Sequence, residues 1–567
     1  AEIGINAKYE EGVFFQSKIE EVTIGEGANF GLGVFQNCLN LKTVNMPEGG
    51  NVHFGEACFA YDIQLEKIDL SKVDSIIEDE TFYGCSLLKI ANLVNVEYIG
   101  DYAFADCSSL NYLNVPKVIK IGEGAFSKYD TNAGAPQISD FTLPDTLTYV
   151  GDGAFLGCEG IVDIVFPESV EYMGDYLFAY CINLTTVKLP KNIKTIGLYS
   201  FANCELLTSI NLDNIEIIKD YAFTSCKSLE KTNLSNVKII GFGSFASSSL
   251  SGEYILTNLE SVDSYAFQNT FITKLEAKKL INIKDAAFAD MDKITSFLLN
   301  DKIEYLGTMA FNGSDSLEKL YFIKDNEECV SGKVNNYLLL DNGCAYVTLQ
   351  SNTFELRAIP SAYNVETIQI LEGTSRIDLY AGNSNKYVKK IILPGSLQLI
   401  GNYAFYGYDN LKEVEFKSFT APLLEDYYNA DSVLPETAPG FDKLHNQFDL
   451  FGYELYYYNF KDLIGVNDPI LMTVPANDGL IGYHNLLYEV YFGKLSEARR
   501  SNEYTMDKNM VDFISFAKKI KTLNVITLAD ERLINDALTA YNGVKQNPAD
   551  FNINIDEWND YVSCVTD

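Results

Sequence analysis

The stretch Ile99-Gly-Asp-Tyr-Ala-Phe104-Ala-Asp-Cys107-Ser-Ser-Leu110-Asn-Tyr-Leu113-Asn-Val115-Pro116 decides the fold, because it recurs in one register along the chain. It returns as Met173-Gly-Asp-Tyr-Leu-Phe178-Ala-Tyr-Cys181-Ile-Asn-Leu184-Thr-Thr-Val187-Lys-Leu189-Pro190, and again over residues 196–212 and 218–234. Its marker phenylalanines are Phe35, Phe59, Phe82, Phe104, Phe126, Phe155, Phe178, Phe201, Phe223, Phe245, Phe267, Phe288, Phe311 and Phe405. Most gaps between successive markers are 21 to 24 residues, which is a period typical of stacked repeats.

Two longer gaps between markers locate the irregular parts of this array. The gap from Phe126 to Phe155 is 29 residues, which predicts a short inserted loop near residues 129–136. The gap from Phe311 to Phe405 is 94 residues, close to four periods. We expect atypical repeats over about residues 323–395, including two strands around an Asp341-Asn-Gly turn.

Each repeat contains one short strand of the pattern Leu-x-x-Ile/Val-x-Leu/Phe. Side chains alternate along a strand, so Leu113 and Val115 point inward while Tyr112 and Asn114 point outward. Gly100 permits a tight bend on the other side of the coil. One coil cannot bury its interior alone, but stacked coils can. The pattern therefore predicts a leucine-rich-repeat solenoid, a right-handed β-coil with one short parallel strand per repeat.

The recurring Ala-Phe, Cys, Leu and Pro markers closely resemble the BspA-like, or Treponema-type, leucine-rich-repeat family over about residues 20–420. The resemblance implies a secreted or surface-attached bacterial protein, and some members of the family are adhesins. It supplies no catalytic residues. We therefore expect an extracellular or cell-surface scaffold that binds a protein or a glycan. A structural spacer that displays another domain is the alternative, and a carbohydrate-active enzyme is a weaker one.

The marker register predicts three segments: a solenoid over residues 1–420, a small β-rich capping module over 421–494, and a short helical spacer or stalk over 495–567. The aromatic-dense residues 451–460 suit either a cap for the open solenoid end or a sugar-binding site. Leu434-Pro-Glu-Thr-Ala438 resembles a sortase signal. We reject that interpretation because the final Gly is replaced and no stop-transfer pattern follows.

Composition excludes several kinds of partner. The formal charge of −35 repels phosphate backbones and anionic lipid, which argues against nucleic acid and bare membrane. No apolar run approaches the length of a membrane span. The three His and the spaced Cys do not form a zinc-site pattern, and no P-loop, G-x-S-x-G or H-E-x-x-H motif occurs. We expect no enzyme activity and no cofactor, while the oligomeric state stays open.

Seven cysteines share one position, three residues after a marker Phe: Cys38, Cys85, Cys107, Cys158, Cys181, Cys204 and Cys226. They could form disulfides or a metal-binding ladder. We favour buried free thiols, because free Cys packs as a small apolar side chain and equivalent Cys on stacked coils point the same way. Cys329 and Cys344, in the atypical stretch, are the better candidates for a disulfide.

Charge is sorted between two faces of the predicted coil. Acidic residues recur at or just after the Gly position, as in Asp152, Asp175 and Asp220, whereas lysines recur in or beside the strands. The sharper hypothesis is a ligand-binding strand face, and the plain one is ordinary solubilising charge. Our candidate binding residues on the strand face are Lys188, Asn211, Lys231, Asn233 and Lys274.

Overall fold

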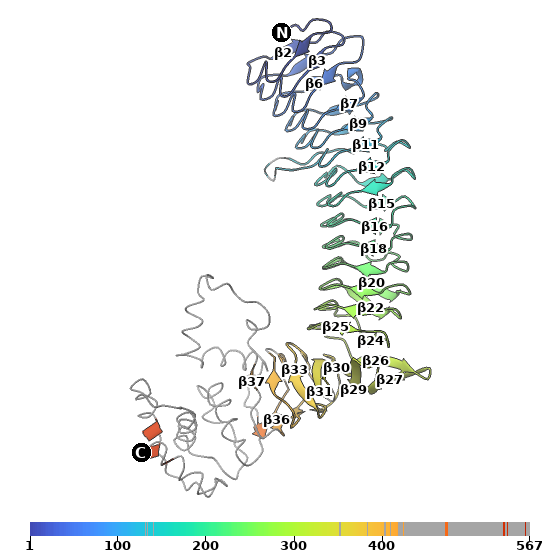
Figure 1. The fold of residues 1–567 in the computed structure, drawn as a ribbon, viewed down its shortest axis with the longest axis vertical. Coiled ribbons are helices and arrows are strands. Elements are labelled where there is room, and N and C mark those ends of the chain that lie inside the picture. The colour runs from blue at the N-terminus through green and yellow to red at the C-terminus, as the bar shows by residue number, and fades with distance from the viewer. Residues whose placement is uncertain are drawn as a thin grey trace. The chain divides into compact units, whose positions relative to one another are not determined.

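The computed structural model describes residues 1–417, apart from 131, 133, 140, 351–352, 383, 402–403 and 409, together with 423–424, 471–473, 537–538, 541–542 and 562. The chain forms two compact units, Ala1–Ile294 and Thr295–Asp567. The first unit is a regular stack of coils (Figure 1). The predicted capping module and helical spacer lie almost entirely outside the described residues.

The Leu-x-x-Val-x-Leu segments of the first unit form the first strand column, whose strands pair in parallel between neighbouring coils. Its strands are β2 (Glu21–Thr23), β4 (Thr43–Asn45), β6 (Lys67–Ile68), β8 (Ile90–Asn92), β10 (Tyr112–Asn114), β13 (Asp163–Val165), β15 (Thr186–Lys188), β17 (Ser209–Ile210), β20 (Ser251–Ile255) and β22 (Phe271–Glu276). A short 3-10 helix, η1 (Leu70–Lys72), follows β6. The burial of Leu113 between exposed Tyr112 and half-buried Asn114 confirms the predicted alternation.

The structure adds a second strand to most coils, just before the Gly position. This second strand column comprises β1 (Lys8–Tyr9), β3 (Asn29–Phe30), β5 (His53–Phe54), β7 (Ile76–Ile77), β9 (Tyr98–Ile99), β11 (Lys120–Ile121), β12 (Tyr149–Val150), β14 (Tyr172–Met173), β16 (Thr195–Ile196), β18 (Ile217–Ile218), β19 (Ile239–Ile240), β21 (Ser261–Val262) and β23 (Asn282–Ile283). These two-residue strands also pair in parallel. The first column is interrupted after β6, β10 and β17, and the second after β5 and β14, so at most steps at least one hydrogen-bonded column fixes a coil against the next.

The marker phenylalanines form the predicted buried ladder in the first unit. Successive rings from Phe35 to Phe288 are nearly parallel, with centroids 5.2 to 5.7 Å apart. Phe14, which the register did not include, stacks on Phe35 at 5.2 Å and extends the ladder by one coil. Offset stacking of this kind adds to the stabilisation that burial alone provides.

The seven ladder cysteines are free and buried, as expected, and each has a structural partner. Each Sγ donates a hydrogen bond to the carbonyl of the preceding coil's ring residue, at 3.1 to 3.2 Å; Cys204, for example, donates to Phe178. Burial raises the pKa of the Cys204 thiol well above its usual range, so the proton stays in place. These thiols satisfy buried carbonyls and are poorly reactive.

One coil has Asp62 where seven others have the ladder cysteine. The Asp62 side chain is fully buried, and its Oδ1 accepts the backbone N–H of Cys38 at 2.7 Å. Its Oδ2 has no hydrogen-bond partner among the described residues. Burial raises the pKa of Asp62 to about 9, so the carboxyl group is protonated at neutral pH.

Glycine and aspartate at the tight bend are linked between neighbouring coils. Asp175 Oδ1 accepts the backbone N–H of Leu198 at 2.8 Å, and a Cβ on Gly197 would lie 2.6 Å from that oxygen. The same contact joins four further pairs: Asp79 with Gly100, Asp101 with Gly122, Asp152 with Gly174, and Asp220 with Gly241. The bend needs glycine there because a carboxylate from the preceding coil occupies the space of its side chain.

The second unit begins with β24 (Ser296–Leu298) and β25 (Tyr305–Leu306), and continues with β26 (Lys319–Lys324), β27 (Glu327–Cys329), β28 (Gly332–Lys333), β29 (Leu338–Asp341), β30 (Cys344–Gln350) and β31 (Thr353–Ala358). Strands β26 with β27, and β28 through β31, are antiparallel. The predicted turn between two strands is confirmed, because β29 and β30 meet at Asn342 and Gly343, with φ of 49° and 80°.

Parallel pairing resumes after β31 through two columns: β33 (Thr374–Ile377), β35 (Leu399–Ile400) and β37 (Leu423–Leu424) in one, and β32 (Thr367–Gln369), β34 (Lys390–Leu393), β36 (Glu413–Phe416) and β38 (Leu471–Thr473) in the other. Cys329 and Cys344 do not form the disulfide considered from the sequence. Cys344 points into the core of this unit, whereas Cys329 lies half-exposed on β27 opposite Phe322.

Candidate binding face on the first strand column

The first strand column is broken between β17 and β20, beside the candidate residues. The intervening coil contains no strand, and in the described structure Lys231–Leu234 form no backbone-to-backbone hydrogen bond with either neighbouring coil. Thr232 takes the inward position that Val187 and Ile210 occupy in the preceding coils. Its hydroxyl donates to the Ile210 carbonyl at 3.2 Å, in place of a backbone ladder bond.

The following coil contributes the second cause of the break. Gly252 adopts a φ of 84°, which favours glycine, and the pairing of β20 with β22 shifts just after it, because β22 has the extra residue Thr273. The bulky Tyr254 points inward, at the position that Thr232 takes in the preceding coil. The Tyr254 hydroxyl accepts the Thr232 backbone N–H at 3.4 Å, and burial raises the pKa of that phenol. A side chain thus replaces the backbone ladder at this step.

A groove of about 280 Å³ opens at this break. Its walls combine a cation, a carboxylate, hydroxyl groups and an apolar side chain: Lys231, Thr232, Asn233, Leu234, Ser235, Ser251, Glu253, Tyr254, Ile255 and Leu256. Ile255 is 60% exposed and adds an apolar surface to the groove. The groove can accept a polar group of a partner together with a small apolar contact.

The structure brings only two of the five candidate residues, Lys231 and Asn233, together at this groove. Lys231 is exposed, whereas Asn233 donates to Asp213 at 2.6 Å and accepts the Ser235 N–H. Lys188 is exposed on β15.

The other two candidates have internal partners. Asn211 binds both backbone groups of Leu189, accepting at 2.6 Å and donating at 3.2 Å. Lys274 pairs with Glu276 at 2.6 Å. Asn211 therefore holds the strand column together, and the assignment of all five residues to a ligand stays a prediction.

Sequence reasoning missed the contribution of Ser251, Glu253, Tyr254 and Ile255 to this face. The sequence did contain a sign of the break in the strand column, because Thr232 stands at an inward strand position where the preceding coils have an aliphatic residue. The spacing from Leu250 to Tyr254 is also one residue longer than the spacing from Leu110 to Leu113. Two consecutive departures from the repeat mark the break.

The acidic residues of the opposite face have a structural role that the sequence did not reveal. Asp152, Asp175 and Asp220 each accept a backbone N–H from the next coil. Asp175 also pairs with Lys219 at 2.9 Å. A hydrogen bond to a charged acceptor is worth about 1.5–3 kcal/mol, so these carboxylates stabilise the stack whatever else they do.

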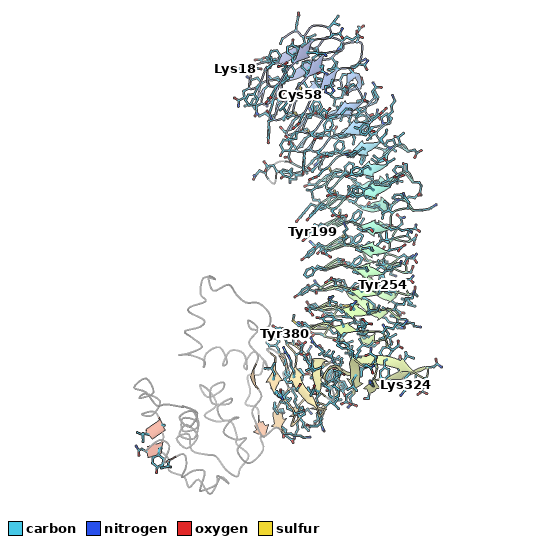
Figure 2. The ribbon with its side chains drawn as sticks, viewed as in Figure 1. Lys18, Cys58, Tyr199, Tyr254, Lys324 and Tyr380 are labelled. Carbon is cyan, nitrogen blue, oxygen red and sulfur yellow. The ribbon has the colours of Figure 1, made fainter. Side chains whose placement is uncertain are left out.

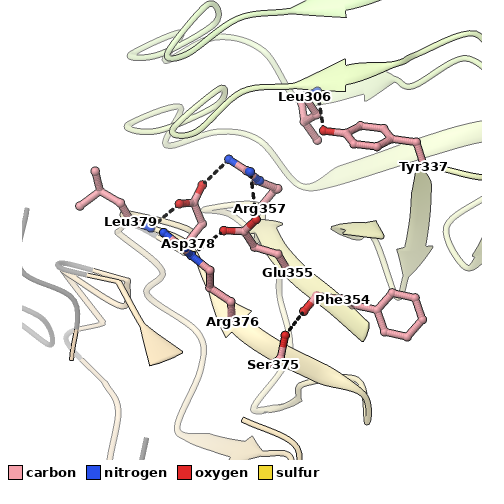
Figure 3. Close-up of polar contacts among 9 residues, drawn as sticks. All are labelled: Leu306, Tyr337, Phe354, Glu355, Arg357, Ser375, Arg376, Asp378 and Leu379. Carbon is pink, nitrogen blue, oxygen red and sulfur yellow. Dashed lines mark hydrogen bonds and ion pairs between the residues drawn. The ribbon is translucent and has the colours of Figure 1, made fainter. Parts of the chain in front are cut away.

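The second unit contains a compact cluster of charged side chains, Glu355, Arg357, Arg376 and Asp378 (Figure 3). Arg357 binds Asp378 at 3.2 Å and Glu355 at 2.9 Å, and Arg376 binds the other Glu355 oxygen at 2.9 Å. Burial raises the pKa of Asp378 to about 7, against the opposing effect of Arg357. Two carboxyl groups face two guanidinium groups inside the fold, so the cluster joins β31 to β33 and offers little to a ligand.

Neither a metal centre nor a membrane span is found in the part of the chain that the structure describes. No group of three or more His, Cys, Asp or Glu side chains there could hold a metal ion. No described helix has the length and apolar character needed to cross a bilayer.

The family model described as "BspA type Leucine rich repeat region (6 copies)" matches residues 7–133, 129–251, 216–336 and 347–432. No curated protein sequence matches this chain. Similar solved structures include a leucine-rich-repeat protein from Bacteroides ovatus, with 23% identity over 62% of this chain and 88% of that chain, at a TM-score of 0.40. Another is a leucine-rich cell surface protein from Faecalibacterium prausnitzii, with 19% identity over 49% and 73% of the two chains, at a TM-score of 0.35.

Proposed function

Because this chain belongs to the BspA-type leucine-rich-repeat family, we propose that it is a non-catalytic scaffold outside a bacterial cell that binds an extracellular protein or glycan on its strand face. The groove between Lys231 and Ile255 is the observation that supports this function most directly. The first strand column also breaks between β6 and β8 and between β10 and β13, so the groove, and not the break alone, favours a binding protein over a spacer. A binding protein uses the groove to expose polar and apolar groups on a rigid frame.

Charge supports the choice of face and location. The net charge of −35 keeps the chain soluble and disfavours nucleic acid and anionic lipid as partners. Lys188 and Lys231 provide exposed cationic groups on the strand face, where an acidic group of a ligand is attracted. The carboxylates of the opposite face accept backbone N–H groups and keep their negative charge. An anionic host protein or glycan therefore meets less repulsion on the strand face.

The test measures binding of the full chain to an array of glycans and extracellular matrix proteins, followed by charge reversal. The triple variant Lys188→Glu, Lys231→Glu and Lys274→Glu should weaken binding of a verified ligand by about tenfold or more at low salt, because it reverses three charges of the strand face to which we assign the ligand. Added salt should also weaken binding by the parent chain.

The matched control is Lys117→Glu, Lys191→Glu and Lys278→Glu, which changes the net charge equally. These three lysines are exposed in the turns that follow the strands. The control should bind almost as well as the parent. If both triple variants lost binding equally, the attraction would depend on the total charge of the chain, which would contradict the strand-face site. A chain that binds nothing saturably on the array would favour a structural spacer.

A further inference from the structure

A column of aromatic side chains runs along a different face of the first unit, at the turn that precedes each marker Phe. Its members, here called the aromatic column, are Tyr176, Tyr199, Tyr221, Phe242 and Tyr265. The four tyrosines share a left-handed backbone, with φ between 52° and 58°. Tyr199 of this column and Tyr254 of the strand-face groove lie on opposite sides of the stack (Figure 2).

Neighbouring rings cover each other inside this column. Centroids of Tyr176 and Tyr199 lie 5.2 Å apart and those of Tyr199 and Tyr221 lie 4.6 Å apart, with nearly parallel planes. Phe242 continues the column at 5.1 Å from Tyr221 and 5.4 Å from Tyr265. The faces of the rings inside the column are therefore covered by neighbouring rings. Tyr176, the first ring, has a neighbour in the column on one side alone, and it is 40% exposed.

The two coils before Tyr176 carry glycine at the column position, Gly124 and Gly153. The Tyr102 ring folds over Gly124, where a Cβ would lie 2.5 Å from Tyr102 Cε1. No ring folds over Gly153, because the preceding residue of the column is itself glycine. A Cβ built on Gly153 would meet only Leu156 Cβ, at 3.7 Å. The column is therefore open at Gly153, between the ring of Tyr102 and the ring of Tyr176.

The opening is close to the width of one sugar ring. Coils in parallel register repeat at about 4.8 Å, so two coils separate the ring over Gly124 from Tyr176 by roughly 10 Å. A pyranose in contact with an aromatic face on each side needs about this space, since carbon atoms pack at about 3.5–4.0 Å.

Further aromatic and polar groups surround the opening. Tyr129 packs edge-on against Tyr102, with centroids 5.4 Å apart, and is 61% exposed. Asp106 holds the start of the inserted loop by accepting the Tyr129 and Asp130 N–H groups at 2.7 and 3.0 Å. Tyr180 is 58% exposed on the coil of Tyr176. Asp152 directly precedes Gly153, and its carboxylate can accept hydrogen bonds from hydroxyl groups beside the opening.

We propose that the opening at Gly153 is a second binding site, which takes a neutral pyranose unit of a glycan against the face of Tyr176. The flat apolar faces of sugar rings pack on tyrosine rings, and carboxylate oxygens accept the sugar hydroxyl groups. A basic peptide is the other chemistry that tyrosines and carboxylates attract. Two lysines already offset part of the negative charge around the opening and so reduce its attraction for a basic peptide. Lys219 pairs with Asp175, and Nζ of Lys120 lies 5.1 Å from the ring centroid of Tyr149.

The test uses native affinity electrophoresis of the full chain in gels containing soluble neutral polysaccharides: hydroxyethylcellulose, a mixed-linkage β-glucan, glucomannan or xylan. At least one polysaccharide should retard the parent. Tyr176→Ala should raise the dissociation constant about tenfold or more, because it removes the aromatic platform. Gly153→Tyr should have the same effect by filling the opening, and it should fold because tyrosine occupies this left-handed position in other coils.

Two variants control for the ring and for the fold. Tyr176→Phe keeps the platform and should retain binding within about threefold, since stacking needs the ring and not its hydroxyl. Tyr221→Ala removes a ring from inside the column and should also retain binding. Thermal melts of all variants separate loss of the site from loss of the stack.

Three outcomes would overturn the proposal. One is that no neutral polysaccharide retards the parent chain. Another is that Tyr176→Ala and Gly153→Tyr, folded as the parent, are retarded as strongly as it is. The third is that an oligolysine peptide binds, in a salt-dependent way that both variants abolish, while no polysaccharide does, since the opening would then recognise cations.

Discussion

Two ladders pass through the same coils of the first unit and behave differently there. Around residues 201–267 the buried rings stack without interruption, with Phe201, Phe223, Phe245 and Phe267 at 5.2 to 5.6 Å from their neighbours. On the other side, the first strand column stops at β17 and resumes at β20. The coil between them keeps its buried ring while it loses its backbone ladder.

The difference indicates which contacts hold the stack and which the protein can give up. Ring stacking and the second strand column continue past the break, where β18, β19 and β21 pair in full register. The cysteine hydrogen bonds end at Cys226, which still binds the Phe201 carbonyl of the preceding coil. Because the ring ladder and the second strand column keep the coil in place, the first strand column can open into a groove at small cost in stability. A repeat protein can therefore vary one face for binding while the other sides stay regular.

The largest loss of stability is expected when one ring is removed from the buried phenylalanine ladder. Phe201→Ala should lower the free energy of unfolding by roughly 3–5 kcal/mol, from lost burial and the cavity left between Phe178 and Phe223. Chemical denaturation monitored by circular dichroism measures this loss. Tyr221→Ala, which removes a half-exposed ring of the same stack of coils, should cost much less. An unchanged midpoint for Phe201→Ala would mean that the rings do not hold the coils together.

Asp62 interrupts the buried column of ladder cysteines. Replacing it tests how much stability this buried departure from the repeat costs. The folded state keeps this carboxyl protonated up to about pH 9, whereas the unfolded chain releases the proton above about pH 3.8. Stability from this group is thus complete below pH 4 and is lost progressively as the pH rises toward 9. Asp62→Cys should stabilise the fold at pH 7 by on the order of 2 kcal/mol, because it removes an unsatisfied buried group.

Unfolding measured at several pH values checks this prediction. The parent should lose stability relative to Asp62→Cys between pH 4 and pH 9. Asp62→Asn keeps an acceptor for the Cys38 N–H without an ionisable group, so it should share the flatter pH profile. Parallel pH profiles for parent and both variants would contradict a protonated Asp62.

The smallest expected effect on stability comes from closing the break. Tyr254→Leu together with Thr232→Val should place aliphatic side chains at both inward positions, let the two backbones pair, and raise the free energy of unfolding by about 0.5–1 kcal/mol. Binding of any strand-face ligand should weaken, because the groove closes. Thr232→Val alone is the control, since it leaves the bulky Tyr254 in place. If the closed variant bound the ligand as well as the parent, the break in the strand column would have no role in binding.

The sequence predicted the features that repeat within one coil. The register located the buried rings, the inward residues of the first strands and the turn at Asn342 and Gly343. It also predicted free ladder cysteines, which the structure confirms. These features follow from periodicity, because one side chain per coil at a fixed position must form a column.

Features that depend on contacts between coils could not be predicted in the same way. Asn211 stays a candidate ligand residue, and its side chain also binds the backbone of Leu189, a contact that the pattern did not predict. The acidic row was interpreted as surface charge, yet Asp175 holds the N–H of Leu198. In each case the partner lies one coil away, 22 to 23 residues distant, and a pattern within one repeat contains no information about it. The strand-face site and the segments beyond residue 420 stay predictions.

The pairing of aspartate with glycine across coils constrains how such an array can change its length. Where a coil lacks the aspartate, the next coil can carry a side chain at the glycine position, as Lys219 does after Leu198 and Asp263 after Phe242. A duplication or deletion that sets an aspartate coil before a coil with a larger residue would force a side chain onto a carboxylate. Recombination must therefore preserve the junction between two coils, so the heritable module of this protein is the junction and not the single repeat.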